Sequence, residues 1–194
     1  MKATWILLML LLNGASDSLC LAQNARRFFP DYVTVQYAGS TGWMGFGTGY
    51  NLFKDHARLG VQYGFVPKEA GGNLQIVSAS LFFKPITVRI SDHILLNPLD
   101  IGTKVGYHFG DQFYVNWPKR FPRGYYWWKS AVRLHLTTES SFTYKIKKGA
   151  KIKSITAYLE LNATDLYLIS YVQNLQSLSL PDIVKAGVGM RVNF

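Results

Sequence analysis

The chain has 194 residues, of which 48% are hydrophobic, 15% aromatic and only 16% charged, and its formal net charge is +10. This length fits one domain, and the lack of a long apolar run after residue 12 excludes a transmembrane helix from the rest of the chain. A mean hydropathy of +0.04 with so many aromatic residues is typical of strands whose alternate side chains face lipid. The positive charge fits anionic headgroups as well as nucleic acid.

Residues 1–22 have the pattern of a signal peptide. Lys2 precedes an apolar run that is too short to span a bilayer as a helix, and small residues stand at the −3 and −1 positions before a cleavage site after Ala22. Lipidation at Cys20 is disfavoured because a leucine precedes it, where lipoprotein signals carry a small residue. We therefore expect residues 23–194 to form one domain without cysteine.

The first half of this domain contains four predicted strands, at about 32–39, 43–53, 57–65 and 74–83. In the first three, apolar positions alternate with polar or glycine positions, and this period of two places successive side chains on opposite faces of a sheet. No helical pattern follows Gly45, Gly47 and Gly49, so we interpret them as facing a crowded barrel interior and not as a nucleotide loop. The fourth strand changes phase near Val77, which predicts a β-bulge there.

The middle of the chain is harder to divide. Residues 85–98 either continue the fourth strand past a proline bend, with a turn at 92–98, or contribute to a ten-strand arrangement. The remaining predicted strands span about 99–109, 131–143, 152–162 and 183–194. Two long connections, 110–130 and 163–182, separate them and lie at the same end of the predicted sheet.

The final segment, IVKAGVGMRVNF, alternates without a break and ends on Phe194. It resembles the closing strand of Gram-negative outer-membrane β-barrels, whose C-terminal aromatic residue is read by the barrel-insertion machinery. The resemblance implies an all-β fold: a closed, antiparallel, up-and-down transmembrane β-barrel of about eight strands, with ten as the alternative. It also implies that the insertion machinery is a partner, and that the protein is located in the cell outer membrane after signal-peptide cleavage.

Charged residues gather on the polar face of the predicted strands. They are Arg58, Asp100, Lys104, Arg133, Glu139, Glu160, Lys185 and Arg191. In a membrane barrel this face lines the lumen, where an unpaired ion costs several kcal/mol. We therefore predict a ladder of ion pairs that plugs the barrel, with a narrow pore as an alternative.

The connection at 110–130 holds the densest aromatic and basic cluster, in QFYVNWPKRFPRGYYWWK. Its candidate ligand-binding residues are Trp117, Lys119, Arg120, Arg123, Tyr125, Tyr126, Trp127, Trp128 and Lys129. Such interleaving can bind nucleic acid, but a secreted protein argues against that partner. We expect an aromatic girdle at the headgroup level of outer-membrane lipids, alone or with basic residues that clasp lipopolysaccharide phosphates. The run FPRGYYWW is similar to a segment of uncharacterised Bacteroidota barrels, and this resemblance carries no activity.

An enzymatic role is the other alternative. Eight-stranded barrels that deacylate or palmitoylate lipid A use a histidine, a serine and an acidic residue near the outer rim, and the weak catalytic candidates here are His108, Asp111 and Ser130. No His-x-Ser pair, zinc spacing, P-loop or calcium loop occurs, so we predict no metal and no cofactor. The sequence favours a structural role, or binding of lipopolysaccharide or partners through outer loops, over a lipid A hydrolase or acyltransferase.

Overall fold

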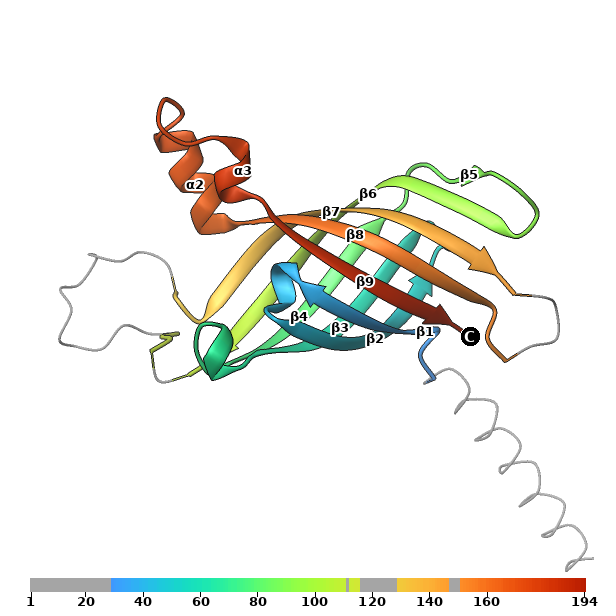
Figure 1. The fold of residues 1–194 in the computed structure, drawn as a ribbon, viewed down its shortest axis with the longest axis horizontal. Helices are drawn as coiled ribbons and strands as arrows, with labels where there is room; N and C mark the ends of the chain where they lie inside the picture. Colours follow the sequence, from blue (N-terminus) through green and yellow to red (C-terminus); the bar gives the residue numbers. More distant parts are fainter. Residues whose placement is uncertain (1–28, 111, 116–128, 147–150) are drawn as a thin grey trace, which may run out of the picture. The chain divides into compact units, whose positions relative to one another are not determined.

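The computed structural model describes residues 29–110, 112–115, 129–146 and 151–194, and residues 31–194 form a unit of their own. In this unit the strands form a closed antiparallel ring (Figure 1). The ring strands are β1 (Tyr32–Ala38), β2 (Met44–Leu52), β3 (Ala57–Val66), β4 (Leu74–Phe83), β6 (Ile94–Phe109), β7 (Val132–Lys145), β8 (Ser154–Thr164) and β9 (Lys185–Asn193). Because β9 pairs with β1 and β4 pairs with β6, the ring is closed, as predicted.

Helical segments lie at one end of the ring, which we call the helical end (Figure 1). They are the 3-10 helices η2 (Gly39–Thr41) and η3 (Lys68–Ala70) and the α-helices α2 (Asp165–Gln173) and α3 (Leu180–Ile183). At the opposite end, which we call the terminal end, the backbone N–H of Phe194 donates to the carbonyl of Asp31 at 2.8 Å. Within the described part of the chain, no helix is long and apolar enough to cross a membrane.

The apolar side chains of the strands point away from the lumen, as the alternation predicts. In β1, for example, Val33 and Val35 are exposed while Thr34 and Gln36 are buried inside the ring. The same pattern continues through β3, β7 and β8. A soluble barrel buries its apolar face and exposes its charges, so this inverted arrangement is that of a transmembrane barrel.

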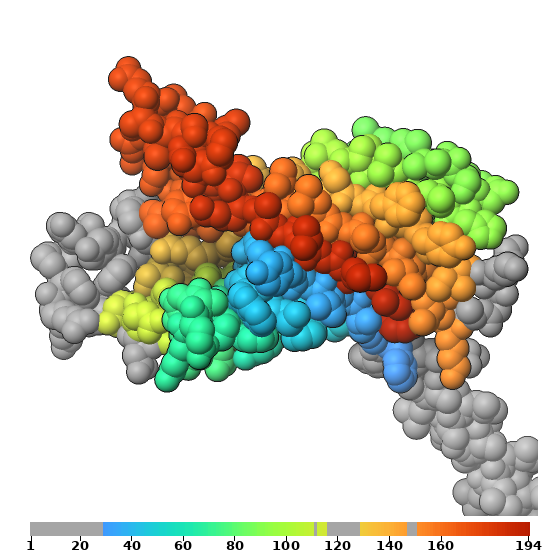
Figure 2. Space-filling view, in the orientation of Figure 1, coloured from blue at the N-terminus to red at the C-terminus, as the bar shows by residue number. Residues whose placement is uncertain are grey.

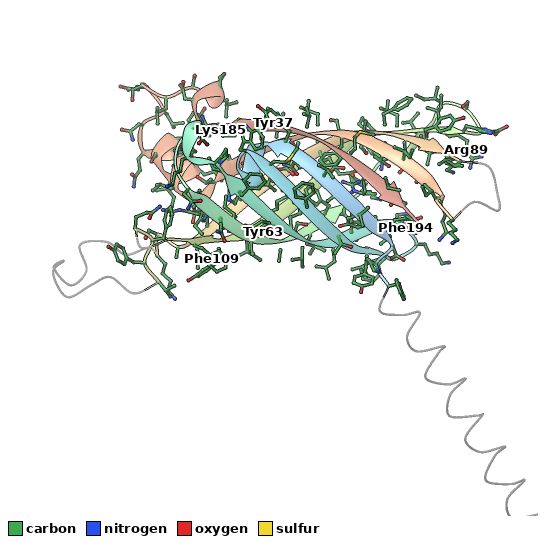
Figure 3. All side chains as sticks on the ribbon, turned by 60° about the horizontal axis from the view of Figure 1, so that its bottom comes forward. Tyr37, Tyr63, Arg89, Phe109, Lys185 and Phe194 are labelled. Carbon is green, nitrogen blue, oxygen red and sulfur yellow. The ribbon has the colours of Figure 1, made fainter. Side chains whose placement is uncertain are left out.

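Exposed aromatic side chains gather at both ends of the barrel. Those toward the helical end are Tyr37, Trp43, Tyr63, Tyr107 and Phe109. Those toward the terminal end are Phe53, Phe83, Phe142, Tyr144 and Phe194. Figure 3 shows Tyr37, Tyr63 and Phe109 well separated along the barrel from Phe194. Amphipathic aromatic rings favour the membrane–water interface, so the two sets fit the two surfaces of one bilayer.

The bulge predicted near Val77 is wrong. β4 pairs in unbroken register with β3 and with β6, and the apparent change of phase arises because Ile76 and Phe82 are apolar residues that face the lumen. The irregularity lies instead in β6, where the register with β7 shifts between Asn97 and Asp100. The sequence of β4 lacks a clean alternation because apolar residues face the lumen, although the strand itself is regular.

The boundaries expected for residues 85–98 also need correction. β6 begins at Ile94, earlier than predicted, and a two-residue strand β5 (Val88–Arg89) pairs with its beginning outside the ring. The ring itself has eight strands, so the ten-strand alternative is wrong. Pro98 lies within the bulge of β6, where a strand tolerates a residue without an N–H, and its carbonyl accepts a hydrogen bond from Ser140 Oγ at 2.6 Å.

The connection between β1 and β2 folds into the barrel. Ser40 and Thr41 of η2 are buried, and η2 fills the lumen at the helical end; we call it the plug. Space for the plug exists because β2 and β3 carry glycines on this side: a Cβ atom on Gly64 would overlap the carbonyl oxygen of Thr41, and one on Gly45 would lie 2.8 Å from the Thr41 Cβ. A Cβ on Gly47 or Gly49 would likewise overlap Gln62 or Tyr32, so the prediction that Gly45, Gly47 and Gly49 face a crowded interior is confirmed.

Replacing Gly64 with alanine is therefore expected to displace the plug and to lower the free energy of unfolding by about 1–3 kcal/mol, as overpacking does. The measurement is urea-induced unfolding of the protein in lipid vesicles. A matched control is Gly106→Ala in β6, where the nearest atom to the new Cβ, Ile76 Cγ2, is 3.7 Å away. This control should change stability by less than about 0.5 kcal/mol, and equal effects of the two substitutions would contradict the role given to the plug.

Candidate functional site

The lumen near the terminal end is filled by four ionised side chains, which we call the arginine cluster: Arg58, Asp100, Glu139 and Arg191. Glu139 is its centre, since Oε2 accepts from Arg58 Nη2 at 2.7 Å, and both carboxylate oxygens accept from Arg191 Nη2, at 2.9 and 2.8 Å. Arg58 Nη1 lies 3.6 Å from Asp100 Oδ2. All four residues are at most 5% exposed, so each charge is compensated by its neighbours and not by water.

Aromatic rings complete this cluster. The Arg58 guanidinium lies 4.6 Å from the centre of the Phe82 ring, and that of Arg191 lies 4.7 Å from the Tyr158 ring and 5.4 Å from the Tyr32 ring. An aromatic face attracts a cation, most strongly where water is excluded. The contact with Arg58 explains why the apolar Phe82 side chain faces a polar lumen.

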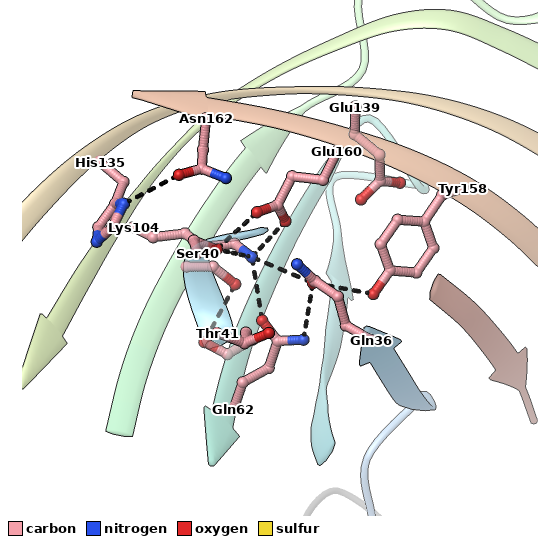
Figure 4. Close-up of polar contacts among 12 residues, drawn as sticks. Gln36, Ser40, Thr41, Gln62, Lys104, His135, Glu139, Tyr158, Glu160 and Asn162 are labelled. Carbon is pink, nitrogen blue, oxygen red and sulfur yellow. Dashed lines mark hydrogen bonds and ion pairs between the residues drawn. The ribbon is translucent and has the colours of Figure 1, made fainter. Parts of the chain in front are cut away.

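Toward the helical end, a second network holds the plug in place; we call it the plug cluster. It consists of Gln36, Ser40, Gln62, Lys104 and Glu160 (Figure 4). Lys104 forms an ion pair with Glu160, and its Nζ donates to Ser40 Oγ at 3.0 Å and to Gln62 Oε1 at 3.1 Å. Ser40 Oγ in turn donates to Glu160 Oε1 at 2.6 Å. The plug is thus tied to three strands of the wall through one lysine.

Between the two clusters remains a void of only about 10 Å³, which is the space of about one water molecule. Together the clusters contain Arg58, Asp100, Lys104, Glu139, Glu160 and Arg191, all predicted to face the lumen. The predicted ladder of ion pairs is confirmed, and it plugs the lumen.

The two other charges assigned to this ladder lie at the rim of the helical end. Arg133 Nη1 lies 3.8 Å from Oδ1 of Asp165, the first residue of α2, and both side chains are partly exposed. The assignment of Lys185 to the lumen is wrong, because it is the first residue of β9 and is exposed; its Nζ lies 5.8 Å from the centre of the Tyr167 ring.

The catalytic candidates are not joined in the described part of the chain. The His108 ring packs against Phe113, with 5.5 Å between ring centres, whereas Ser130 Oγ accepts from the backbone N–H of Tyr114 at 2.7 Å. Asp111 lies outside the described residues. No hydrogen bond among the described residues links His108 to Ser130, so these contacts do not form a nucleophile–base pair. The described residues also contain no group of three potential metal ligands.

Most of the predicted ligand-binding residues also lie outside the described part of the chain. They are Trp117, Lys119, Arg120, Arg123, Tyr125, Tyr126, Trp127 and Trp128. Lys129 is described and exposed. The expectation of a girdle built by this connection therefore stays a prediction.

A second candidate site lies at the terminal end, where the barrel opens into a cavity of about 620 Å³ that we call the vestibule. Four lysines line it: Lys54, Lys84, Lys145 and Lys153. Sequence reasoning missed them. Each stands within two residues of a strand end on the side of the termini, and that shared position was the available signal.

Lys84 follows β4 and is half-buried in the wall of the vestibule. Burial, together with the charges of Arg58 and Arg191, lowers the pKa of Lys84 from 10.5 to about 8. In the unfolded chain this lysine should keep an ordinary pKa of about 10.4. The unfolded state therefore binds more protons at this residue, so its contribution makes the protein more stable as pH rises from about 8 to about 10.4.

The acylation rate of Lys84 by an amine-reactive reagent is expected to rise with pH with a midpoint of about 8 in the folded protein. Only the neutral amine reacts, so peptide-level mass spectrometry across a pH series measures this midpoint directly. The same series in denaturant should give a midpoint near 10.4, as for a free lysine. Identical midpoints in the two states would show that the fold does not desolvate this side chain.

A closed ring of eight strands, apolar on its outer surface and ionic inside, defines this protein as a transmembrane β-barrel with a plugged lumen. No family model matches the sequence, and no curated protein matches it either.

Two solved structures are similar in fold. The crystal structure of the N-terminal β-barrel domain of Pseudomonas aeruginosa OprF matches with 12% identity and a TM-score of 0.42, covering 85% of this chain and 98% of that one. The backbone structure of the Yersinia pestis outer membrane protein Ail in a phospholipid bilayer nanodisc matches with 11% identity and a TM-score of 0.37, covering 84% of this chain and 97% of that one. Identities this low carry no information about function.

Proposed function

We propose that this protein is an integral outer-membrane β-barrel protein whose role is structural, and that it contacts lipids or partners through the connections at its helical end. The observation that supports this most directly is the inverted distribution of side chains, with an apolar belt outside and paired ions within. The aromatic residues at both ends of the belt support it as well. The ion-filled lumen favours a scaffold over a conduit.

Single-cysteine labelling on intact cells tests both the location and the orientation. Cleavage after Ala22 would leave the protein without cysteine, so Ser177→Cys, between α2 and α3, and Asp92→Cys, between β5 and β6, would each carry one thiol. A membrane-impermeant maleimide is expected to label Ser177→Cys on intact cells and Asp92→Cys only after the outer membrane is permeabilised. The opposite pattern, or recovery of the protein in the soluble periplasmic fraction, would contradict the proposal.

The α2–α3 connection offers one surface for lipid. Residues 166–181 contain no charged side chain, and Val172, Leu175 and Leu180 are 69%, 63% and 58% exposed. Figures 1 and 2 show this segment as a lobe that stands off from the wall beside the ends of β8 and β9. A helix that is apolar on all sides is normally buried, and the lipid-facing belt of the barrel is adjacent. We therefore place this lobe against the outer leaflet.

A fluorophore on Val172→Cys, with the protein in nanodiscs, is expected to be quenched by brominated lipid and shielded from iodide. The matched control is Glu69→Cys, exposed in η3 at the same end. This label should respond to iodide and not to brominated lipid. Equal iodide quenching at both positions would place the lobe in water.

We also propose that the protein binds lipopolysaccharide, through the basic residues of the 110–130 connection. The amount of lipopolysaccharide that copurifies with the protein measures this contact. A variant with Lys119, Arg120, Arg123 and Lys129 all changed to glutamine is expected to retain less lipopolysaccharide than the wild type, because Arg and Lys pair with phosphate. Unchanged retention would leave the structural role standing and remove the lipopolysaccharide contact.

A further inference from the structure

The vestibule is a blind chamber large enough to hold a ligand. Its volume of about 620 Å³ lies in the range of small-molecule sites. It opens at the terminal end, and Arg191, which belongs to the arginine cluster, contributes to its inner wall. Because that cluster and the plug fill the rest of the lumen, whatever enters the vestibule must leave the same way.

The wall of the vestibule carries an excess of free cations. Lys54 and Lys153 stand at its rim, whereas Lys84 and Lys145 are half-buried. Among the described residues, none of these four lysines has a carboxylate within the 4.0 Å of an ion pair. Their charges are therefore available to a ligand.

Acidic groups in the same wall offset this excess only in part. They are Asp31, Asp55 and the carboxylate of Phe194. Asp31 Oδ2 already accepts from the backbone N–H of Asn51 at 2.8 Å, which leaves it less free to neutralise a lysine. The net charge of the groups that line the vestibule is therefore positive.

Neutral hydrogen-bonding groups complete the wall, with Asn97, Ser141, Thr143 and Asn193 among them. Two buried polar atoms of lining residues, Arg191 Nε and Asn51 Oδ1, have no hydrogen-bond partner among the described residues. Buried polar groups are nearly always paired. Arg191 Nε is a donor that an anion or a water molecule would satisfy, whereas Asn51 Oδ1 is an acceptor and needs a donor such as water.

We propose that the vestibule binds a small ligand bearing two or more negative charges, such as linked phosphate or carboxylate groups. Lysine suits such a ligand because its ammonium is a point charge with three donors, and several lysines can each meet a different oxygen. Half-buried cations interact with an anion more strongly than surface cations do, since less water screens them. This inference does not depend on the proposed structural role or on the helical end.

The low pKa of Lys84 supports the same conclusion. Desolvation and two neighbouring arginines disfavour its charged form, and the charges of Asp100 and Asp55 offset this only in part. A bound anion would supply that compensation, and linkage then requires the pKa of Lys84 to rise when the ligand binds. Acylation of Lys84 therefore reports on occupancy.

The experiment uses the purified protein in nanodiscs of zwitterionic phosphatidylcholine, with inorganic pyrophosphate as the probe. At pH 8, pyrophosphate is expected to slow acylation of Lys84 several-fold and to leave that of Lys68, exposed in η3 at the helical end, unchanged. Titration calorimetry should show pyrophosphate affinity falling as salt is raised. No protection of Lys84 by millimolar pyrophosphate, or equal protection of both lysines, overturns the proposal.

Variants separate the site from general charge effects. Lys84→Gln and Lys145→Gln are each expected to weaken pyrophosphate binding about tenfold, the loss of one charge-assisted hydrogen bond, whereas Lys68→Gln should not change it. Lys84→Arg keeps the charge and should retain most of the affinity. Retained heat-modifiability on gels shows that each variant is folded, and undiminished binding by folded Lys84→Gln and Lys145→Gln proteins counts against the site.

Changing the lipid of the nanodisc distinguishes a free anion from a lipid headgroup as the ligand. If cardiolipin, whose headgroup carries two phosphates, protects Lys84 in the nanodisc without pyrophosphate, the anion is supplied by the surrounding lipid. If only pyrophosphate protects it, the ligand comes from solution. Both outcomes require that pyrophosphate protects Lys84 in phosphatidylcholine nanodiscs, and without that protection the proposal fails.

Discussion

Replacing Glu139 with glutamine is expected to lower the free energy of unfolding by about 3–5 kcal/mol, because breaking a buried ion pair leaves its partners uncompensated. The neutral amide would face Arg58 and Arg191, both buried, and each of these arginines donates its shortest hydrogen bonds to this one carboxylate. Asp100 is a weak substitute, since its nearest oxygen lies 3.6 Å from Arg58. Glu139 pairs with both arginines, so this one substitution removes two ion pairs from the arginine cluster.

Urea titration in lipid vesicles, followed by gel mobility and tryptophan fluorescence, measures this loss. The matched control is Glu69→Gln, which makes the same chemical change on an exposed residue of η3 and should alter stability by less than about 0.5 kcal/mol. A similar, small effect of both substitutions would mean that water or the lipid headgroups solvate the arginines, and the description of a sealed lumen would then fail.

The second large effect is expected at the ion pair that holds the plug. Lys104→Met should lower the free energy of unfolding by about 3–5 kcal/mol, because Glu160 would keep its charge while losing its only ion-pair partner among the described residues. Changing both residues together, as Lys104→Met with Glu160→Met, removes both charges. This double variant should be less destabilised than the sum of the two single variants.

A double-mutant cycle provides the measurement, and strict additivity would contradict a direct pair. Planar-bilayer recordings add an independent readout. The wild type should conduct close to background, because the clusters leave a void of only about 10 Å³. Lys104→Met should raise conductance if release of Ser40 lets the plug leave the lumen, whereas Gly106→Ala, which leaves the cluster intact, should not.

The orientation of most side chains could be predicted from the sequence, because the pleat of a strand fixes a period of two. Arg58, Glu139 and Arg191 come from β3, β7 and β9, yet each holds the in-facing phase of its own strand. Because buried charges must be paired, these three side chains are predicted to contact one another inside the barrel. Both the orientation and the pairing can be inferred without knowing which strands are neighbours.

Features that depend on three-dimensional contacts could not be read in this way. Phe82 faces inward because Arg58 stacks over its ring, and this apolar residue in a polar phase suggested a bulge that does not exist. The segment GSTG has the composition of an ordinary turn, and nothing local shows that Ser40 reaches Glu160 inside the barrel. The helices α2 and α3 are short and depend on capping by Thr164 and Ser179, so hydrophobic periodicity did not reveal them.

The vestibule was missed for a related reason. Its lysines come from three separate connections, with Lys145 and Lys153 on either side of the one between β7 and β8, and closure of the ring brings these connections around one opening. The same reasoning explains the misplacement of Lys185: the in-facing phase of β9 is correct, but its first residue lies beyond the closed part of the lumen and reaches water.

The pairing of β1 with β9 has a kinetic consequence. It joins residues far apart in the chain, as in the hydrogen bond from Thr34 Oγ1 to the Met190 carbonyl across 156 positions. The loop entropy of that junction must be lost before its ladder contributes any stability, so we expect refolding into vesicles to be slow, with this seam forming last. Until then two strand edges stay open, and a chain delayed at that stage is prone to pair with another copy of itself.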